Sequence, residues 1–340
     1  MGLMPKPVAR AIRSVRDRFD RNPNRAVPAV LRDEAKIVRW ISELTGEPHS
    51  TVRRRLREEY DHFGINVSRA MAEAGLEPYV WSDDLIKFYE QTDAFLYELV
   101  TWNLNRLKAL MRRFVARMLK SDGPGPYDVL SIGDGLGVDS AHLAARGHRV
   151  TYHEVSGYTE AFARRVFKDC GVDVRIVVDE SELPAEGFDA VICLDVLEHV
   201  PDPPAMVRRM VGYLRPGGRL LVHSPFMWIH HSNPTHLRAS RRYSGSLDLY
   251  RQAGLTLVDG TPAWSPLSLR KADTPGKARR GAALNRMIIR CVGAGMTTGR
   301  LVTFPFLWGD DLRLIEARWF PNPAKEPEAA PVTTVCERWR

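Results

Sequence analysis

The spacing of hydrophobic residues changes near residue 125. Between residues 31 and 120 apolar side chains recur every three or four positions, which is the period of a helix with one buried face. Ser82, followed by Asp83 and Asp84, has the composition of a helix start. One apolar face then continues through Leu96, Leu99, Leu104, Leu107, Leu110, Phe114 and Leu119. We therefore predict a helical cap or dimerisation domain over residues 31–122, which ends at the Gly- and Pro-rich run 121–126.

Short apolar runs alternate with helical patterns after residue 126. Strand patterns occupy residues 129–132, 150–152, 174–178, 189–194, 219–223 and 255–259. Helical patterns begin at Ala141 and occupy 158–168, 203–214 and 246–253. Such alternation indicates a doubly wound α/β domain with a mainly parallel sheet. We place this domain at residues 125–320, with a basic insertion at about 265–300 and a last strand at Leu312–Trp319.

The two ends of the chain carry its excess of positive charge. The formal net charge is +8, yet residues 125–264 carry 17 acidic and 14 basic side chains, a net of −3. Residues 1–30 contain a basic amphipathic helix pattern, with Val8, Ile12, Val15 and Phe19 on one face. This helix either docks on its own protein, which we prefer, or lies on an anionic membrane surface. The basic insertion could be a lid, a dimer contact or a surface for anionic lipid, and residues 321–340 are expected to be disordered.

Several classes of protein are disfavoured by composition. Charge confined to the ends argues against a domain that coats nucleic acid. The four cysteines form no CxxC pair, so neither a disulfide framework nor a cysteine zinc site is indicated. No apolar run approaches the roughly 18 residues of a membrane span, and the N-terminus lacks the apolar core of a signal peptide. We therefore expect a cytoplasmic protein.

One stretch of the helical domain resembles a helix-turn-helix. Residues 41–46 and 48–56 are separated by a short turn, which would place Ser50–Arg55 at the start of a recognition helix. The pattern is short, and residues 31–124 contain equal numbers of basic and acidic side chains. We prefer a helical cap or a homodimer contact, and DNA binding stays open as an alternative.

A nucleotide site is predicted where the first strand ends. Residues 129–132 run into Gly133-Asp134-Gly135-Leu136-Gly137, and a helical pattern follows. Glycines allow a tight turn and close approach of a ligand, and the helix start supplies free N–H donors. The dinucleotide-binding spacing would need a glycine at Val138, which weakens an NAD interpretation. Glu154 ends the second strand, where a carboxylate can accept both ribose hydroxyls.

Two further strings complete a family resemblance. Residues 188–200 read FDAVICLDVLEHV, and residues 214–218 read LRPGG. With the glycine turn and Glu154, their order and spacing resemble a class I S-adenosylmethionine (SAM)-dependent methyltransferase, of the branch that contains ubiquinone-biosynthesis and sugar O-methyltransferases. The resemblance covers residues 125–260 and implies a Rossmann-like seven-stranded sheet.

The resemblance also implies the cofactor, SAM, and the residues that bind it. Gly133, Gly135 and Gly137 would lie beside its methionine part, Glu154 would hold the ribose, and Asp179 would accept from the adenine amino group. Glu180 would lie beside Asp179, and Leu194 and Asp195 would line the site. The family usually has an acidic residue where this chain has Ser131, and Asp134 would take over that role.

The methyl acceptor needs a group that receives its proton, and histidine suits this near neutral pH. The candidates are His199, His223, His230, His231 and His236, and we select His236 first and His199 second. Asp195-x-x-Glu198-His199 also resembles a divalent-metal motif of small-RNA 2′-O-methyltransferases. Asp is shorter than the Glu of that motif, and metal-independent relatives share the string, so we assign no metal ligand.

The leading hypothesis is methyl transfer to a hydroxyl of a small-molecule or glycosyl acceptor. One alternative is a methyltransferase of RNA or another macromolecule, held through the basic ends of the chain. A second is a helix-turn-helix DNA-binding regulator with a degenerate SAM domain.

Overall fold

The computed structural model describes residues 28–123, 125–260 and 266–272. The predicted N-terminal basic helix, the strand at 312–319, the tail at 321–340 and most of the basic insertion lie outside these residues. The first part of the described chain is helical, as the hydrophobic spacing predicts. Its elements are η2 (Ala29–Arg32), α2 (Glu34–Thr45), α3 (His49–Asp61), α4 (Ile65–Glu73), α5 (Asp83–Gln91), α6 (Ala94–Leu104) and α7 (Arg106–Ser121).

Side-chain caps explain where several of these helices begin. The Asp33 carboxylate accepts from the backbone N–H of Lys36 before α2, and Ser82 accepts from Leu85 before α5. Such caps satisfy N–H groups that have no partner inside the helix. Helix α2 ends at Gly46, whose left-handed backbone (φ 75°) stops the helix and lets the chain turn into α3.

The second part is a doubly wound α/β sheet, as predicted. Its strand order is β3-β2-β1-β4-β5-β7-β6, with β7 antiparallel to both of its neighbours. The strands are β1 (Asp128–Ile132), β2 (Arg149–His153), β3 (Val174–Val177), β4 (Phe188–Leu194), β5 (Leu214–His223), β6 (Leu255–Asp259) and β7 (Leu267–Lys271). Strand β7 includes Arg270 and Lys271, which the sequence analysis had placed in the basic insertion.

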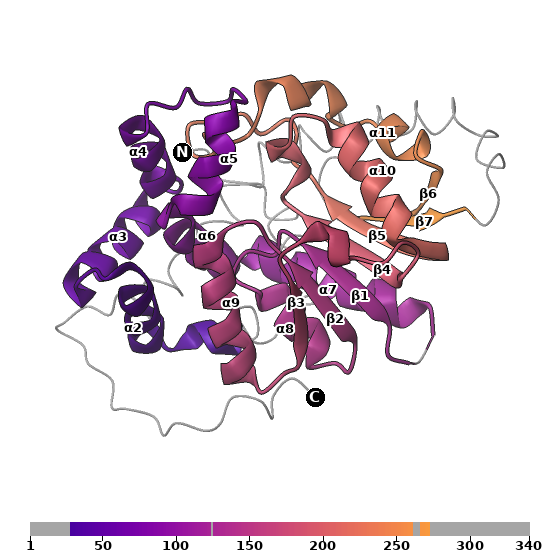
Figure 1. Cartoon of the computed structure of the whole chain (residues 1–340), viewed down its shortest axis with the longest axis horizontal. Helices are drawn as coiled ribbons and strands as arrows, with labels where there is room; N and C mark the ends of the chain where they lie inside the picture. The colour runs from indigo at the N-terminus through magenta and orange to yellow at the C-terminus, as the bar shows by residue number, and fades with distance from the viewer. Residues whose placement is uncertain (1–27, 124, 261–265, 273–340) are drawn as a thin grey trace, which may run out of the picture.

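Helices cover both faces of the sheet (Figure 1). The remaining elements are α8 (Val138–Ala144), α9 (Gly157–Cys170), η3 (Glu180–Glu182), η4 (Leu197–His199), α10 (Pro203–Tyr213), η5 (Arg238–Tyr243) and α11 (Asp248–Arg251). Helix α10 packs with β4 and β5, and α8 lies against β2. No helix within the described ranges is both long and apolar enough to cross a bilayer.

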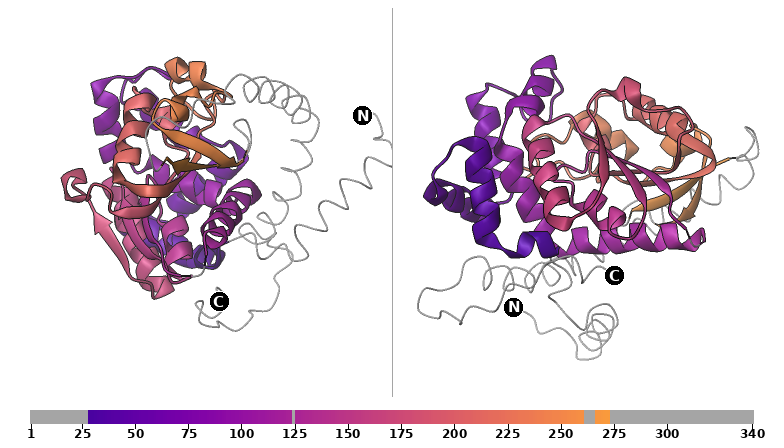
Figure 2. Two further views of the ribbon diagram at one scale, coloured as in Figure 1. Left: turned by 90° about the vertical axis from the view of Figure 1, so that its right-hand side faces the viewer. Right: turned by 60° about the horizontal axis from the view of Figure 1, so that its bottom comes forward.

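The N-terminal helices share their hydrophobic core with the sheet domain. Ile37 and Ile41 of α2 belong to the same buried cluster as Phe162 and Val166 of α9. Helix α7 lies along the sheet (Figure 2), where Val115 joins a cluster with residues of β1, β4 and β5. The helical region is therefore packed into the α/β unit, and α6 and α7 reach the edge at which the parallel strands end.

Candidate functional site

The glycine turn lies between β1 and α8, at the carboxyl edge of the sheet. Gly133, Gly135 and Gly137 all have a left-handed backbone, with φ of 68°, 63° and 72°. This conformation strains residues that carry a Cβ atom, so the turn requires glycine. The predicted strand–turn–helix is therefore present.

Strand β2 holds the turn from one side. The Tyr152 hydroxyl donates to the Gly135 carbonyl at 2.6 Å, and the Gly135 N–H donates to Glu154 Oε2 at 2.8 Å. Glu154 Oε1 accepts from the Val155 N–H at 2.8 Å. Burial raises the pKa of Glu154, and these backbone donors oppose that rise. Oε1 also accepts from the Ser156 N–H at 3.4 Å, so Oε2 is the oxygen that keeps a lone pair for a ligand hydroxyl.

Two apolar side chains cover the turn. A Cβ atom built on Gly135 would lie 2.5 Å from Leu99 Cδ1 of α6, and one built on Gly133 would lie 2.4 Å from Val196 Cγ2. The turn and the Glu154 carboxylate lie where the resemblance implies the methionine and ribose parts of SAM, and the side chains of Leu99 and Val196 fill the space against the glycines.

Asp134 has a different environment from the one expected. Its carboxylate is buried and accepts from the backbone N–H groups of Asp139 (3.2 Å) and Ser140 (2.7 Å) in the first turn of α8. Burial, followed by the nearby Asp139 carboxylate, raises the pKa of Asp134. Asp134 therefore caps the start of α8, and its role towards the methionine ammonium stays a prediction. Ser131 is buried within β1.

The predicted adenine-binding residues follow β3 at the same edge. Asp179 is exposed and accepts from the Ser181 N–H at 2.9 Å. Glu180 accepts from the Tyr213 hydroxyl at 2.5 Å and from Arg209 at 2.8 Å, which ties its carboxylate to α10. Asp179 is thus open to a ligand, whereas Glu180 has partners within the protein.

Asp195 follows the buried Leu194 at the end of β4 and lies in a network of charged groups. Its Oδ1 is 2.5 Å from His223 Nδ1, and its Oδ2 is 3.1 Å from Trp102 Nε1 and 3.6 Å from Lys108 Nζ. Burial alone would raise the pKa of Asp195, but His223 and Lys108 hold it below the ordinary value. Asp195 is therefore ionised, and its backbone is left-handed (φ 62°) although it is not a glycine.

A second cluster contains Glu198, His199 and His236. One donor atom from each lies within 4.8 Å of the other two, with His199 Nε2 3.9 Å and His236 Nε2 4.0 Å from Glu198 Oε1. His199 Nδ1 is 3.0 Å from the Tyr89 hydroxyl of α5. Burial lowers the pKa of His199 to about 4 and that of His236 well below its usual value. Both imidazoles are therefore neutral near pH 7.

The Glu198 carboxyl is buried, and neither oxygen hydrogen-bonds to any residue in the described part of the chain. Burial, followed by the negative charge of Asp195, raises its pKa well above the ordinary value. A buried polar group without a partner is costly. One carboxylate and two neutral imidazoles can bind a divalent cation. From the sequence alone we assign no metal ligand. The three groups that converge include His236, which lies far from the motif in sequence, and exclude Asp195, which faces His223 and Lys108.

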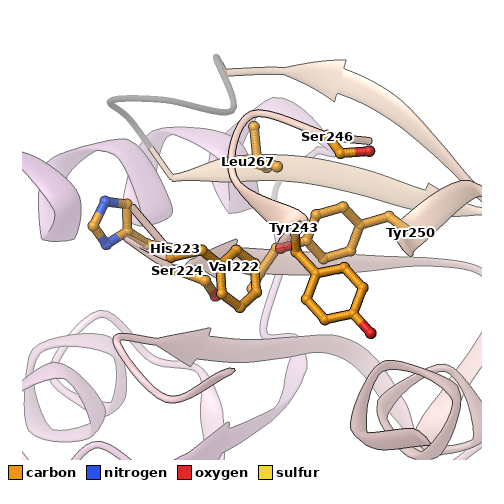
Figure 3. Close-up of a pocket in the computed structure, with 8 residues that line it drawn as sticks. Val222, His223, Ser224, Tyr243, Ser246, Tyr250 and Leu267 are labelled. Atoms are coloured by element: carbon orange, nitrogen blue, oxygen red, sulfur yellow. The ribbon is translucent and has the colours of Figure 1, made fainter. Parts of the chain in front are cut away.

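A small hollow of about 10 Å³ opens beside the end of β5. Its lining includes His223, Ser224, Phe226, Tyr243 and Tyr250, and Figure 3 shows the His223 ring at one end, apart from the two tyrosines. This volume is room for about one water molecule.

Sequence reasoning missed the residues that α5, α6 and α7 bring to this edge: Tyr89, Leu99, Trp102, Lys108 and Arg112. A signal existed for two of them. Lys108 and Arg112 lie four positions apart among the buried residues of α7, where apolar side chains are expected. Two cations on a buried helix face indicate buried anionic partners, and the structure supplies Asp139 and Asp195.

Comparisons with known proteins agree with this geometry. A family model described as a methyltransferase domain matches residues 104–257, so the match begins at the end of α6 and includes α7. The ubiquinone biosynthesis O-methyltransferase of Xanthomonas axonopodis pv. citri is 36% identical over 123 residues, which cover 35% of this chain and 50% of that protein. That of Paramagnetospirillum magneticum is 33% identical over 151 residues, 44% of this chain and 57% of that protein.

The chain thus spans about half the length of the curated relatives that it matches. Among solved structures, the N-methyltransferase NodS from Bradyrhizobium japonicum, in complex with S-adenosyl-L-homocysteine, is 20% identical. That match covers 57% of this chain and 98% of NodS, with a TM-score of 0.40. The strand order, the glycine turn and the family match lead to one conclusion: the chain contains a class I SAM-dependent methyltransferase domain, distantly homologous to the ubiquinone biosynthesis O-methyltransferases.

Proposed function

We propose that this protein is a SAM-dependent methyltransferase that transfers a methyl group to a hydroxyl of a small-molecule or glycosyl acceptor. The observation that carries the proposal is the glycine turn held between Tyr152 and Glu154, at the carboxyl edge where ligands of α/β sheets bind. The O-methyltransferase names of the partial relatives support a hydroxyl acceptor.

In this proposal the chain binds and orients both reactants. SAM supplies a methyl group that its sulfonium already activates. Gly133 and Gly135 lie beside the methionine part once Leu99 and Val196 move aside, Glu154 accepts from the ribose with the remaining lone pair of Oε2, and Asp179 accepts from the adenine amino group. Leu194 and Asp195 line the site. His236 and His199 were selected from the sequence as bases, and as neutral imidazoles they can accept a proton or bind a cation beside Glu198.

The regulator alternative has weaker support from the structure. The three arginines of the helix-turn-helix-like segment make ion pairs within the protein: Arg53 with Glu34, Arg54 with Glu58, and Arg55 with Asp93 and Glu47. DNA phosphates would have to compete with these carboxylates. The RNA alternative depends on basic ends that lie almost entirely outside the described residues.

Calorimetric titration of the full chain with SAM tests the cofactor half of the proposal. Glu154→Gln should weaken binding by roughly tenfold to a hundredfold, because hydrogen bonds to a charged acceptor contribute about 1.5–3 kcal/mol. Glu160→Gln is the matched control, since Glu160 pairs with Arg164 on the surface of α9. Absence of SAM binding by the wild-type protein would refute the proposal.

Mass spectrometry tests the acceptor half. Extracts of cells that lack the protein should accumulate a compound that wild-type protein and SAM convert to a product one methylene heavier. Methylation of a hydroxyl acceptor but not of the amine analogue supports oxygen transfer, and the reverse preference contradicts it.

A further inference from the structure

We propose that His223, oriented by Asp195, is the base that receives the proton of the acceptor hydroxyl. The inference rests on the proposed function and adds a catalytic residue to it. His223 is the last residue of β5, and Asp195 directly follows β4, its parallel neighbour in the sheet. The Asp195 N–H donates to the His223 carbonyl at 2.9 Å, and the two side chains meet at 2.5 Å. Main chain and side chain thus both hold the pair together.

The backbone of Asp195 is strained in a way that serves this contact. A left-handed conformation is unfavourable for a residue with a Cβ atom and persists only where the surroundings enforce it. Here Trp102, Lys108 and His223 all bind the carboxylate. Strain of this kind is concentrated at functional sites.

Asp195 determines which nitrogen of His223 carries the proton. An ionised carboxylate can only accept a hydrogen bond, so His223 Nδ1 must be the protonated nitrogen. The lone pair of a neutral ring then lies on Nε2. That nitrogen makes no hydrogen bond to any residue of the described ranges, and the side chain is 11% exposed. A base needs this combination of a fixed tautomer and a free lone pair.

The other two candidates at this edge are arranged differently. His199 has Nδ1 beside Tyr89 Oη and the Thr235 carbonyl, and its Nε2 faces Glu198. His236 also faces Glu198. The Glu198 carboxyl has a raised pKa, whereas the Asp195 carboxylate is ionised through its contacts. The charged and titratable groups near His223 include Asp195 of the β4 end, which also pairs with Lys108 of α7, and His236 of the loop after β5. Tyr243 and Tyr250 line the same hollow as His223.

The step balances without a further reactant. As the acceptor oxygen forms its bond to the methyl carbon, the carbon–sulfur bond breaks and its electron pair stays on sulfur. His223 Nε2 takes the hydroxyl proton, and Asp195 remains ionised and stabilises the imidazolium. Trp102 and Lys108 act as positioning residues, so α6 and α7 complete a site whose base belongs to the sheet.

The tautomer of His223 can be measured without an acceptor. Long-range ¹H–¹⁵N spectra of the full chain, labelled with ¹⁵N-histidine, should show His223 as the Nδ1–H form, with its signals assigned through their loss in His223→Gln. Asp195→Asn should change the His223 signals. The matched control, Glu198→Gln, should change those of His199 and His236 and leave His223 unaltered. A wild-type His223 in the Nε2–H form would overturn the proposal.

Kinetics supply the second readout. The probe is 3,4-dihydroxybenzoate, a small molecule with two phenolic hydroxyls, with methyl-tritiated SAM as donor. His223→Gln should lower kcat at least a hundredfold, because a positioned base contributes about 10²–10⁴-fold, while the calorimetric Kd for SAM changes less than twofold. If the variant keeps wild-type kcat on this probe, His223 is not the base. If wild-type protein binds no SAM, the proposed function fails instead. If it binds SAM but does not turn over this phenol, the Nδ1–H form of His223 supports the proposal and the Nε2–H form overturns it.

Discussion

Replacement of Lys108 by methionine tests how the helical region is joined to the site. The Lys108 ammonium is buried, 3.0 Å from Asp139 Oδ2 of α8 and 3.6 Å from Asp195 Oδ2. Burial alone would lower the pKa of Lys108, but the two carboxylates raise it above the ordinary lysine value. Lys108→Met keeps the length of the side chain and removes the charge that α7 shares with both partners.

The magnitude follows from opposing terms. At an effective dielectric constant of about 20, each attraction is worth roughly 5 kcal/mol. Desolvation of the ammonium, several kcal/mol, offsets much of this gain. Removal of one partner of a buried ion pair usually destabilises by about 3–5 kcal/mol. Because Arg112 still binds Asp139, and Trp102 still binds Asp195, we expect the free energy of unfolding to fall by about 3 kcal/mol.

Urea unfolding at pH 7, followed by circular dichroism, measures this loss as a lower midpoint at unchanged slope. The matched control is Lys87→Met, since Lys87 makes an exposed pair with Asp84 and should have no measurable effect. The free energy of unfolding of Lys108→Met could instead lie within about 0.5 kcal/mol of the wild-type value, well below the cost expected for a broken buried pair. That result would refute the claim that Lys108 stabilises the fold through its ion pairs with Asp139 and Asp195.

Three further outcomes are expected. Asp122→Asn should destabilise by about 2 kcal/mol at pH 7, because Asp122 accepts charged hydrogen bonds from the buried Arg219. Burial alone would raise the pKa of Asp122, but Arg219 holds it below its ordinary value. The difference in free energy of unfolding between wild type and Asp122→Asn should therefore shrink as the pH falls below about 4. A difference that does not change with pH would contradict this prediction. Gly135→Ala should abolish SAM binding in calorimetry, whereas Gly147→Ala, equally left-handed but with open space around it, should only lower stability. Zn²⁺ should bind the wild-type protein in calorimetry and bind Glu198→Gln at least tenfold more weakly, and equal affinity would rule out the cluster as its site.

The glycine turn and the place of Glu154 beside it were readable from local sequence. A left-handed turn needs glycine whatever surrounds it, and the end of a buried strand next to that turn is where Glu154 had to lie. The alternation of strand and helix patterns likewise predicted the doubly wound sheet. These features depend on neighbours in the chain, which the sequence shows directly.

The acceptor half was not readable in this way. The resemblance implies that Asp134 helps to position the methionine ammonium, but it does not show that the carboxylate is buried and accepts two N–H groups at the start of α8. His236 and Glu198 come together although 38 positions separate them in the chain. This contact depends on the path of the loop after β5, which carries His236 back to Glu198.

The sequence by itself determined the fold class, the glycine turn and the position of Glu154, because backbone conformation and strand burial follow from local residue types. Only the tertiary structure decided that Leu99 covers the turn and that Trp102 and Lys108 bind Asp195. It also decided that His223 shares that carboxylate. The packing of α6 and α7 against the sheet brings these groups within a few ångströms of one another, and that packing arises from the shape of a core shared by residues far apart in the chain.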